Sequence, residues 1–387
     1  MPAHQWTNAY LDRMRLTGDD TADGVIREVF ETRQTARLHE LFRHLQENDD
    51  PLPGELPARV REYLEETDAP PPRTEPIEKG AALFTEHGPA ILILLGCYSL
   101  PTLYAAGKGV KVLRASGFLA LNPVRRVFET TQMVLDTMRP GGLTDRNGRG
   151  VRTCQKVRLM HAAIRRLLLS SDDPRWETER DGVPINQEHM AGTLMTFAVL
   201  VPWGLRRMRL RIAAEQIDGW FAAWRYIGRL LGIRPELIPE SFERGEELAR
   251  RILARMIEPT EDSRVVEAAL LQSFDKPFPW WLKGRLASIT RFFLYNVLED
   301  DRRLRVADAV GVPRRPFRDW RFRFYLTHAP EFQRFRVLKR FSLGIIQMLV
   351  DAERGGGRAE FRIPEELSRH WSERDAWGLK LPAPLQR

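Results

Sequence analysis

One histidine in this chain has the setting of a buried ligand or base. His161 lies within an apolar-periodic segment in which Cys154, Val157, His161, Ile164 and Leu168 follow one another at steps of three and four residues. This spacing predicts a helix whose buried stripe carries the imidazole. Two interpretations follow from the residues alone: a satisfied core histidine, or a histidine that acts as a ligand or a base.

Two arginines flank this histidine on the same predicted helix. Arg158 precedes His161 by three residues and Arg165 follows it by four, so both are expected to border the same helix face. A guanidinium group suits planar, two-pronged contacts with carboxylates. The two arginines are therefore candidates either for contacts with the carboxylates of a cofactor or for ion pairs that hold adjacent helices.

The sequence does not indicate a metal centre built from protein ligands alone. A zinc site would need a HExxH motif or a Cys/His cluster, and the chain has neither near His161 and only two cysteines, Cys97 and Cys154. Haem needs only one axial nitrogen from the protein, because the macrocycle supplies four ligands. The remaining histidines lie in terminal regions or beside loop signals, which predicts solvated or structural roles. They are His4, His39, His44, His87, His189, His328 and His370.

The elements that must position His161 are predicted to be helices throughout. Apolar residues recur at three and four residues, and few runs are rich in Val, Ile and Thr. Residues 1–74 are predicted to form an N-terminal helical extension with amphipathic segments over Asp20–Gln46 and Pro57–Glu66. The extension ends in the proline-rich run 69–76, since proline removes backbone donors and restrains its neighbours.

A single helical domain is predicted over residues 75–354, followed by a C-terminal tail over residues 355–387 that begins with three glycines. Within the domain, the uncharged run Pro89–Gly107 is predicted to form two buried helices, because Gly96, Ser99 and Pro101 would interrupt a membrane span; membrane insertion is the alternative. Turn chemistry separates the helices at 139–142, 171–174, 232–235 and 311–313.

Composition excludes several classes of protein. The chain has 387 residues, a formal net charge of +8, 43% hydrophobic and 29% charged residues, which is typical of a soluble, core-forming protein and not of a disordered or polytopic membrane protein. The N-terminus has neither a basic start nor an apolar signal region. With two cysteines only, these features predict a reduced, cytoplasmic protein.

One segment raises the alternative of a nucleic-acid partner. Residues 314–340 interleave Arg with Phe, Trp and Tyr, in the manner of a stacking platform for bases. Elsewhere Arg alternates with Asp and Glu, and aromatic residues at helical spacing favour a core-facing helix whose Arg stems cover apolar surface. Nucleic-acid binding is therefore not expected, and a basic protein that binds nucleic acid or an anionic membrane stays an alternative.

Several runs of this sequence resemble the rubber oxygenase (latex clearing protein) family, which also includes the fungal oxygenase that cleaves a farnesyl chain in mycophenolic acid biosynthesis. The resemblance covers roughly residues 78–345. Its most specific part is an Arg-x-x-His-x-x-x-Arg helix followed by Pro-Ile-Asn-Gln. The runs are SLPTLYAA (99–106), RVFET (126–130), KVRLMHAAIR (156–165), GVPINQ (182–187) with TLMTF (193–197), and WRYIGRLLGI (224–233).

The resemblance implies an all-α domain with a globin-like core that holds haem b, with His161 as the proximal iron ligand. In such a site Arg158 and Arg165 are the candidate cofactor-binding residues, with ion pairs between helices as the alternative. Asn186 is expected to cap the helix that begins at Gln187.

The distal side implied by the resemblance comes from the preceding helix. Arg126 and Thr130 match the family pattern, whereas Glu129 stands where the family has Lys; the three are the candidate catalytic residues. The implied reaction is dioxygenase-type oxidative cleavage of a C=C bond, with O₂ and an apolar, isoprenoid-like small molecule as partners and peripheral membrane contact as a further expectation. A non-catalytic haem carrier or gas sensor is the alternative.

Overall fold

The computed structural model describes residues 6–31, 58–67, 71, 73–115, 123–145, 148–170, 176–275, 285–296 and 306–312. Within these ranges the chain forms helices and no strand, and the one β-type pairing is an isolated bridge between Ala106 and Ile257. The prediction of an all-α fold is confirmed. The helices are α1 (Asn8–Arg15), α2 (Asp20–Glu31), α4 (Ala58–Thr67), α5 (Glu75–Leu94), η1 (Leu95–Ser99), α6 (Leu100–Tyr104), α7 (Gly107–Ala115), α9 (Pro123–Met138), α10 (Arg149–Ser170), α11 (Thr178–Asp181), α12 (Gln187–Ala198), α13 (Leu200–Arg207), α14 (Ala214–Leu230), η2 (Pro235–Leu237), α15 (Phe242–Met256), α16 (Glu261–Asp275) and α17 (Arg285–Asn296).

Helix ends coincide with the predicted turns in the part of the chain that the structure describes. α9 ends at Met138 and α10 at Ser170, each directly before a predicted turn, and α14 ends at Leu230, two residues before the next. α2 begins at Asp20 as expected, but the predicted helix beyond Glu31 lies outside the described residues. So do the Arg/aromatic segment 314–340 and the C-terminal tail.

Residues 89–104 of the apolar run Pro89–Gly107 lie in one continuous helical rod, so the prediction of two separate helices is wrong. α5 passes into the π-helix η1, in which the N–H of Leu100 bonds to the carbonyl of Leu95, and then into α6. Pro101 lacks the N–H that an α-helix would use here, so the turn widens instead of ending. The rod Glu75–Tyr104 is the described helix long and apolar enough to cross a membrane, yet 83% of its most apolar window is buried inside the protein.

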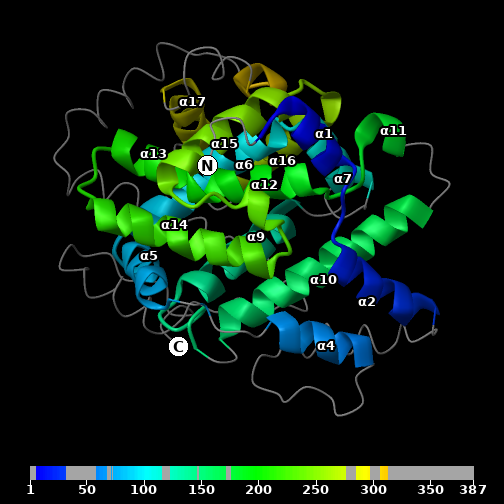
Figure 1. Cartoon of the computed structure of the whole chain (residues 1–387). Coiled ribbons are helices and arrows are strands. Elements are labelled where there is room, and N and C mark those ends of the chain that lie inside the picture. Colours follow the sequence, from blue (N-terminus) through cyan, green and yellow to red (C-terminus); the bar gives the residue numbers. More distant parts are fainter. Residues whose placement is uncertain are drawn as a thin grey trace.

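α5 and α14 lie side by side (Figure 1). They approach closely because glycines meet at their crossing. A Cβ atom on Gly80 would lie 2.5 Å from the carbonyl oxygen of Gly219, and a Cβ on Gly219 would lie 2.8 Å from the backbone nitrogen of Gly80. No side chain fits between the two backbones.

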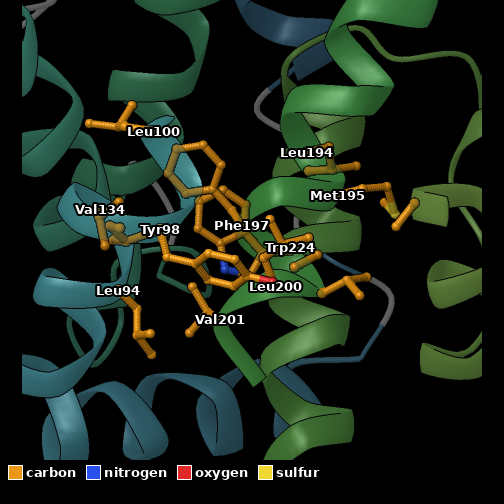
Figure 2. Packing of buried hydrophobic residues seen from close by; sticks show 14 of the residues in the cluster. Leu94, Tyr98, Leu100, Val134, Leu194, Met195, Phe197, Leu200, Val201 and Trp224 are labelled. Carbon is orange, nitrogen blue, oxygen red and sulfur yellow. The ribbon is translucent and has the colours of Figure 1, made fainter. Parts of the chain in front are cut away.

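Side chains from this rod meet those of α12, α13 and α14 in the main core (Figure 2). Trp224 is only 2% exposed, and its ring centroid lies 4.7 Å from that of Phe197 and 5.7 Å from that of Trp220. Tyr98 stacks on Phe293 with ring centroids 5.7 Å apart. Phe197 and Trp224 also line the cavity described below, so their contact positions part of its wall.

A second, smaller core joins the N-terminal helices to α10. α2 and α4 lie against its outer face (Figure 1), and the apolar residues buried there include Ile26, Tyr63, Leu159 and Ala162. The Tyr63 hydroxyl donates to the carbonyl of Gln155 at 3.0 Å. The N-terminal extension is therefore packed directly on the helix that carries His161.

We expect Gly80→Ala to destabilise the protein by about 1–3 kcal/mol, because overpacking at a backbone contact forces the two helices apart. Gly24→Ala is the matched control: its Cβ would lie 3.5 Å from the nearest atom, an ordinary contact, and alanine favours helix. Denaturant unfolding measures both. Equal midpoints for the two variants would contradict the close crossing.

A buried acid on α16 gives the fold a pH dependence. Glu267 is 1% exposed, and within the described residues neither of its carboxylate oxygens has a hydrogen-bond partner. Burial raises the pKa of Glu267 to about 8. In the unfolded chain a glutamate ionises near 4.5, so from about pH 4.5 to pH 8 the folded state binds more protons and stability falls as pH rises.

Glu267→Gln should remove this loss, which approaches about 1.4 kcal/mol per pH unit within that window. The variant is expected to gain stability relative to wild type between pH 5 and pH 8, with no further gain above pH 8. Glu62→Gln is the control, since the Glu62 side chain is 57% exposed. Parallel stability curves for Glu267→Gln and wild type would show that Glu267 is already ionised in the folded protein.

Candidate functional site

An open cavity lies among α6, α7, α9, α10, α12 and α14. Its volume is about 200 Å³. Most of the lining is aliphatic, aromatic or methionine side chains. The polar side chains of the described lining are Tyr104, Glu129, Thr130, His161, His189 and Thr193.

His161 reaches this cavity from the middle of α10. Val157, Met160 and Ile164 of the same helix line the cavity beside it, while Cys154 and Leu168, at the two ends of the predicted stripe, are buried at 0% and 5% exposure. The middle of the predicted apolar stripe of α10 therefore lines the cavity, and its two ends pack in the core.

The structure brings two of the three candidate distal residues to the same cavity. Glu129 and Thr130 lie next to each other on α9 and both line it, as His161 does. Arg126 lies on the same helix one turn earlier, but its side chain is outside the described residues. A carboxyl, a hydroxyl and an imidazole thus share one apolar chamber.

Arg158 and Arg165 do not line the cavity. At 3.6 residues per turn they fall on one side of His161, and the cavity-lining residues of α10 fall on the other. Two nitrogens of the Arg158 guanidinium donate to the Asp19 carboxylate, Nε to Oδ2 at 2.6 Å and Nη2 to Oδ1 at 2.8 Å. Arg165 pairs with Asp23. Of the two roles open from the sequence, this geometry favours ion pairs between helices over contact with a cofactor.

Arg165 also holds the turn that leads into α12. Its Nε donates to the carbonyl of Pro184 at 3.0 Å and its Nη2 to the carbonyl of Ile185 at 2.9 Å. Ile185 has φ of 50°, a strained conformation for a β-branched residue, and its side chain lines the cavity. Asn186 then caps α12, accepting from the backbone N–H of His189 at 2.9 Å, as predicted.

His189 is a cavity residue that sequence reasoning missed. Burial lowers the pKa of His189 to about 4, with Arg15 and Lys108 adding to the effect, so the ring is neutral at physiological pH. The amide nitrogen of Asn186 lies 3.4 Å from Nδ1; an amide nitrogen only donates, which leaves the ring hydrogen on Nε2. The available signal was its position in the first turn of a helix capped by Asn186.

Within the described ranges, no group of three or more His, Cys, Asp or Glu side chains could hold a metal ion. His161, His189 and Glu129 all line the cavity, but they do not form such a group. A metal ion held by His161 would need most of its ligands from a cofactor.

Comparisons with known proteins show the family and the fold of the chain. Residues 77–330 match the family model described as ER-bound oxygenase mpaB/B'/Rubber oxygenase, catalytic domain. The rubber oxygenase of Streptomyces sp. (strain K30) is 24% identical over 263 residues, which are 65% of this chain and 62% of that protein. The matched region thus spans less than two thirds of that relative. The structure of a latex clearing protein in the closed state superposes with a TM-score of 0.73 and 21% identity, over 91% of this chain and 95% of the other.

Proposed function

Because the chain belongs to the family of ER-bound oxygenase mpaB/B' and rubber oxygenase catalytic domains, we propose that it is a haem b-dependent oxygenase that cleaves a C=C bond in an apolar substrate. The observation that carries the proposal is the shared cavity, in which the His161 imidazole, the Glu129 carboxyl and the Thr130 hydroxyl line walls that are otherwise mainly apolar. The oxygenase class is taken from the family and its named relative, and the cavity is the proposed site of the reaction.

The residues present fit the cofactor. Haem takes one axial nitrogen from the protein, and His161 offers an imidazole in an open cavity whose walls are mainly apolar. When bound, the haem iron would supply the binding and activation of O₂. The overall reaction is balanced without an external reductant, since one alkene and one O₂ give two carbonyl groups.

The chain's own residues would then orient the reactants and handle protons. Aliphatic and methionine side chains of the wall exclude water and bind the hydrocarbon on either side of the alkene. Glu129 is placed to hold or move a proton at its carboxyl group, and Thr130 to donate or accept a hydrogen bond through its hydroxyl. His189, held neutral, adds a second donor to the wall without adding charge.

The absorption spectrum of the purified protein tests the cofactor. We expect a Soret band in wild type and its loss in His161→Ala, because the axial imidazole is removed while the helix is kept. His189→Gln is the control, since it changes the other imidazole of the same cavity and should retain haem. A colourless wild type after reconstitution with haemin would refute haem dependence, and haem loss from His189→Gln alone would move the ligand to His189.

Glu129→Gln tests the proposed proton-handling residue. The variant keeps the shape of the side chain and removes its ionisable proton, so oxygen uptake with a test alkene such as squalene should fall by roughly 10²–10⁴-fold, with haem content unchanged. Glu62→Gln, whose carboxylate is exposed, should retain wild-type uptake. Undiminished turnover in Glu129→Gln would leave Arg126 and Thr130 as the candidates.

A further inference from the structure

Two acidic residues of the N-terminal extension, outside the family-matched range 77–330, contact the helix that carries His161. We propose that Asp19 and Asp23 are positioning residues for the His161 site, which they hold in place through Arg158 and Arg165. This inference rests on the proposed function for its link to haem. Neither aspartate lines the cavity, so each acts through its arginine.

The pair before His161 fixes α10 to the start of α2. Both oxygens of Asp19 accept from Arg158, and the two side chains are only 5% and 11% exposed. The Arg158 guanidinium also lies over the ring of Tyr63, 5.4 Å from its centroid. A two-pronged, buried contact of this kind restrains rotation of α10 about its axis, because rotation would strand a buried charge.

The pair after His161 fixes α10 to the cavity wall as well as to α2. The Arg165 side chain is 3% exposed and joins α10 to two other segments. It pairs with Asp23 of α2 and donates to the carbonyls of Pro184 and Ile185 in the turn before α12. The strained turn at Ile185 is thereby held with its side chain in the cavity. Asp23 is the carboxylate that orients this guanidinium.

Two glycines allow the backbone to approach the two aspartates closely. A Cβ atom on Gly18 would lie 2.7 Å from Asp23 Oδ2, and one on Gly232 would lie 2.3 Å from Asp19 Oδ2. Gln187 joins the same two glycines, donating to both carbonyls at 2.9 Å. The N-terminal segment, the end of α14 and the start of α12 are thus locked together beside α10.

Because Arg158 and Arg165 lie three residues before and four residues after His161, the two pairs hold the turns on either side of the imidazole. A small rotation or shift of α10 would change the direction of the ring toward a bound haem. A displacement of a ligand side chain by a few tenths of an ångström weakens a binding site while the fold is kept. The N-terminal extension is in this sense part of the site.

Asp19→Asn and Asp23→Asn test the inference, with Asp20→Asn as the matched control because Asp20 lies in the same turn but its side chain is 92% exposed. In the haem-loaded protein, haem transfer to apomyoglobin should be at least about tenfold faster in each of the two variants, and the iron–histidine stretching frequency of the ferrous form should shift. Asp20→Asn should match wild type within about twofold. All rates are measured well below the unfolding transition of each variant.

Hydrogen exchange on the haem-free protein separates this inference from the proposed function. Faster exchange confined to residues 158–165 and 183–189 in the two variants, and absent from Asp20→Asn, would support the coupling even if wild type binds no haem. If both variants match wild type in haem transfer rate, iron–histidine stretching frequency and hydrogen exchange, the positioning role is overturned while the haem assignment stands. A variant that only unfolds more easily, with these three readouts unchanged, would also overturn it. If one variant does not fold, the other decides.

Discussion

The cavity depends on how α10 divides its surface between two environments. One face must present an imidazole and aliphatic side chains to an open apolar chamber, while the adjacent face carries two guanidinium groups that cannot be left unpaired in the interior. Burial of an unpaired charge costs several kcal/mol, so the chain must bring carboxylates to that face. Asp19, directly before α2, and Asp23, within it, supply these carboxylates. The Asp19–Arg158 pair is buried, whereas the Asp23 side chain is 25% exposed.

This arrangement has a consequence for the opposite wall. Arg165 has donors left after its contact with Asp23, and they bind the carbonyls of Pro184 and Ile185. The strain at Ile185, whose φ is 50°, is sustained by those two hydrogen bonds and by the Asn186 cap directly after it. The same guanidinium therefore fixes the position of α10 and the shape of the cavity wall formed by Ile185 and His189.

Many helices and their ends could be predicted from the sequence, because they depend on residues that are close together along the chain. Apolar spacing of three and four residues, together with Gly/Pro turns, placed the helix around His161 and the ends of α9, α10 and α14. The face assigned to Arg158 and Arg165 was only half correct: they are neighbours of His161, but they turn away from the cavity. The spacing of residues along a helix predicts the direction in which each side chain points, but not which other segment packs there. Asp19 and Asp23, more than 130 residues away in sequence, could therefore not be predicted as the partners of Arg158 and Arg165. His189 was missed for the same reason, since its place in the cavity arises from the packing of α12.

Cavity composition limits what the chamber can receive. Among the described lining residues, Glu129 is the one Asp, Glu, Lys or Arg, and His189 stays neutral because burial holds its pKa near 4. A carboxyl group in an apolar wall disfavours an anion beside it, and no described lysine or arginine lines the wall to offset that repulsion. The hydrocarbon part of a ligand is suited to this wall, whereas the carboxylates of a haem group would have to find cations elsewhere. Arg158 and Arg165 already have carboxylate partners, so the cations for such a cofactor must come from outside the described lining.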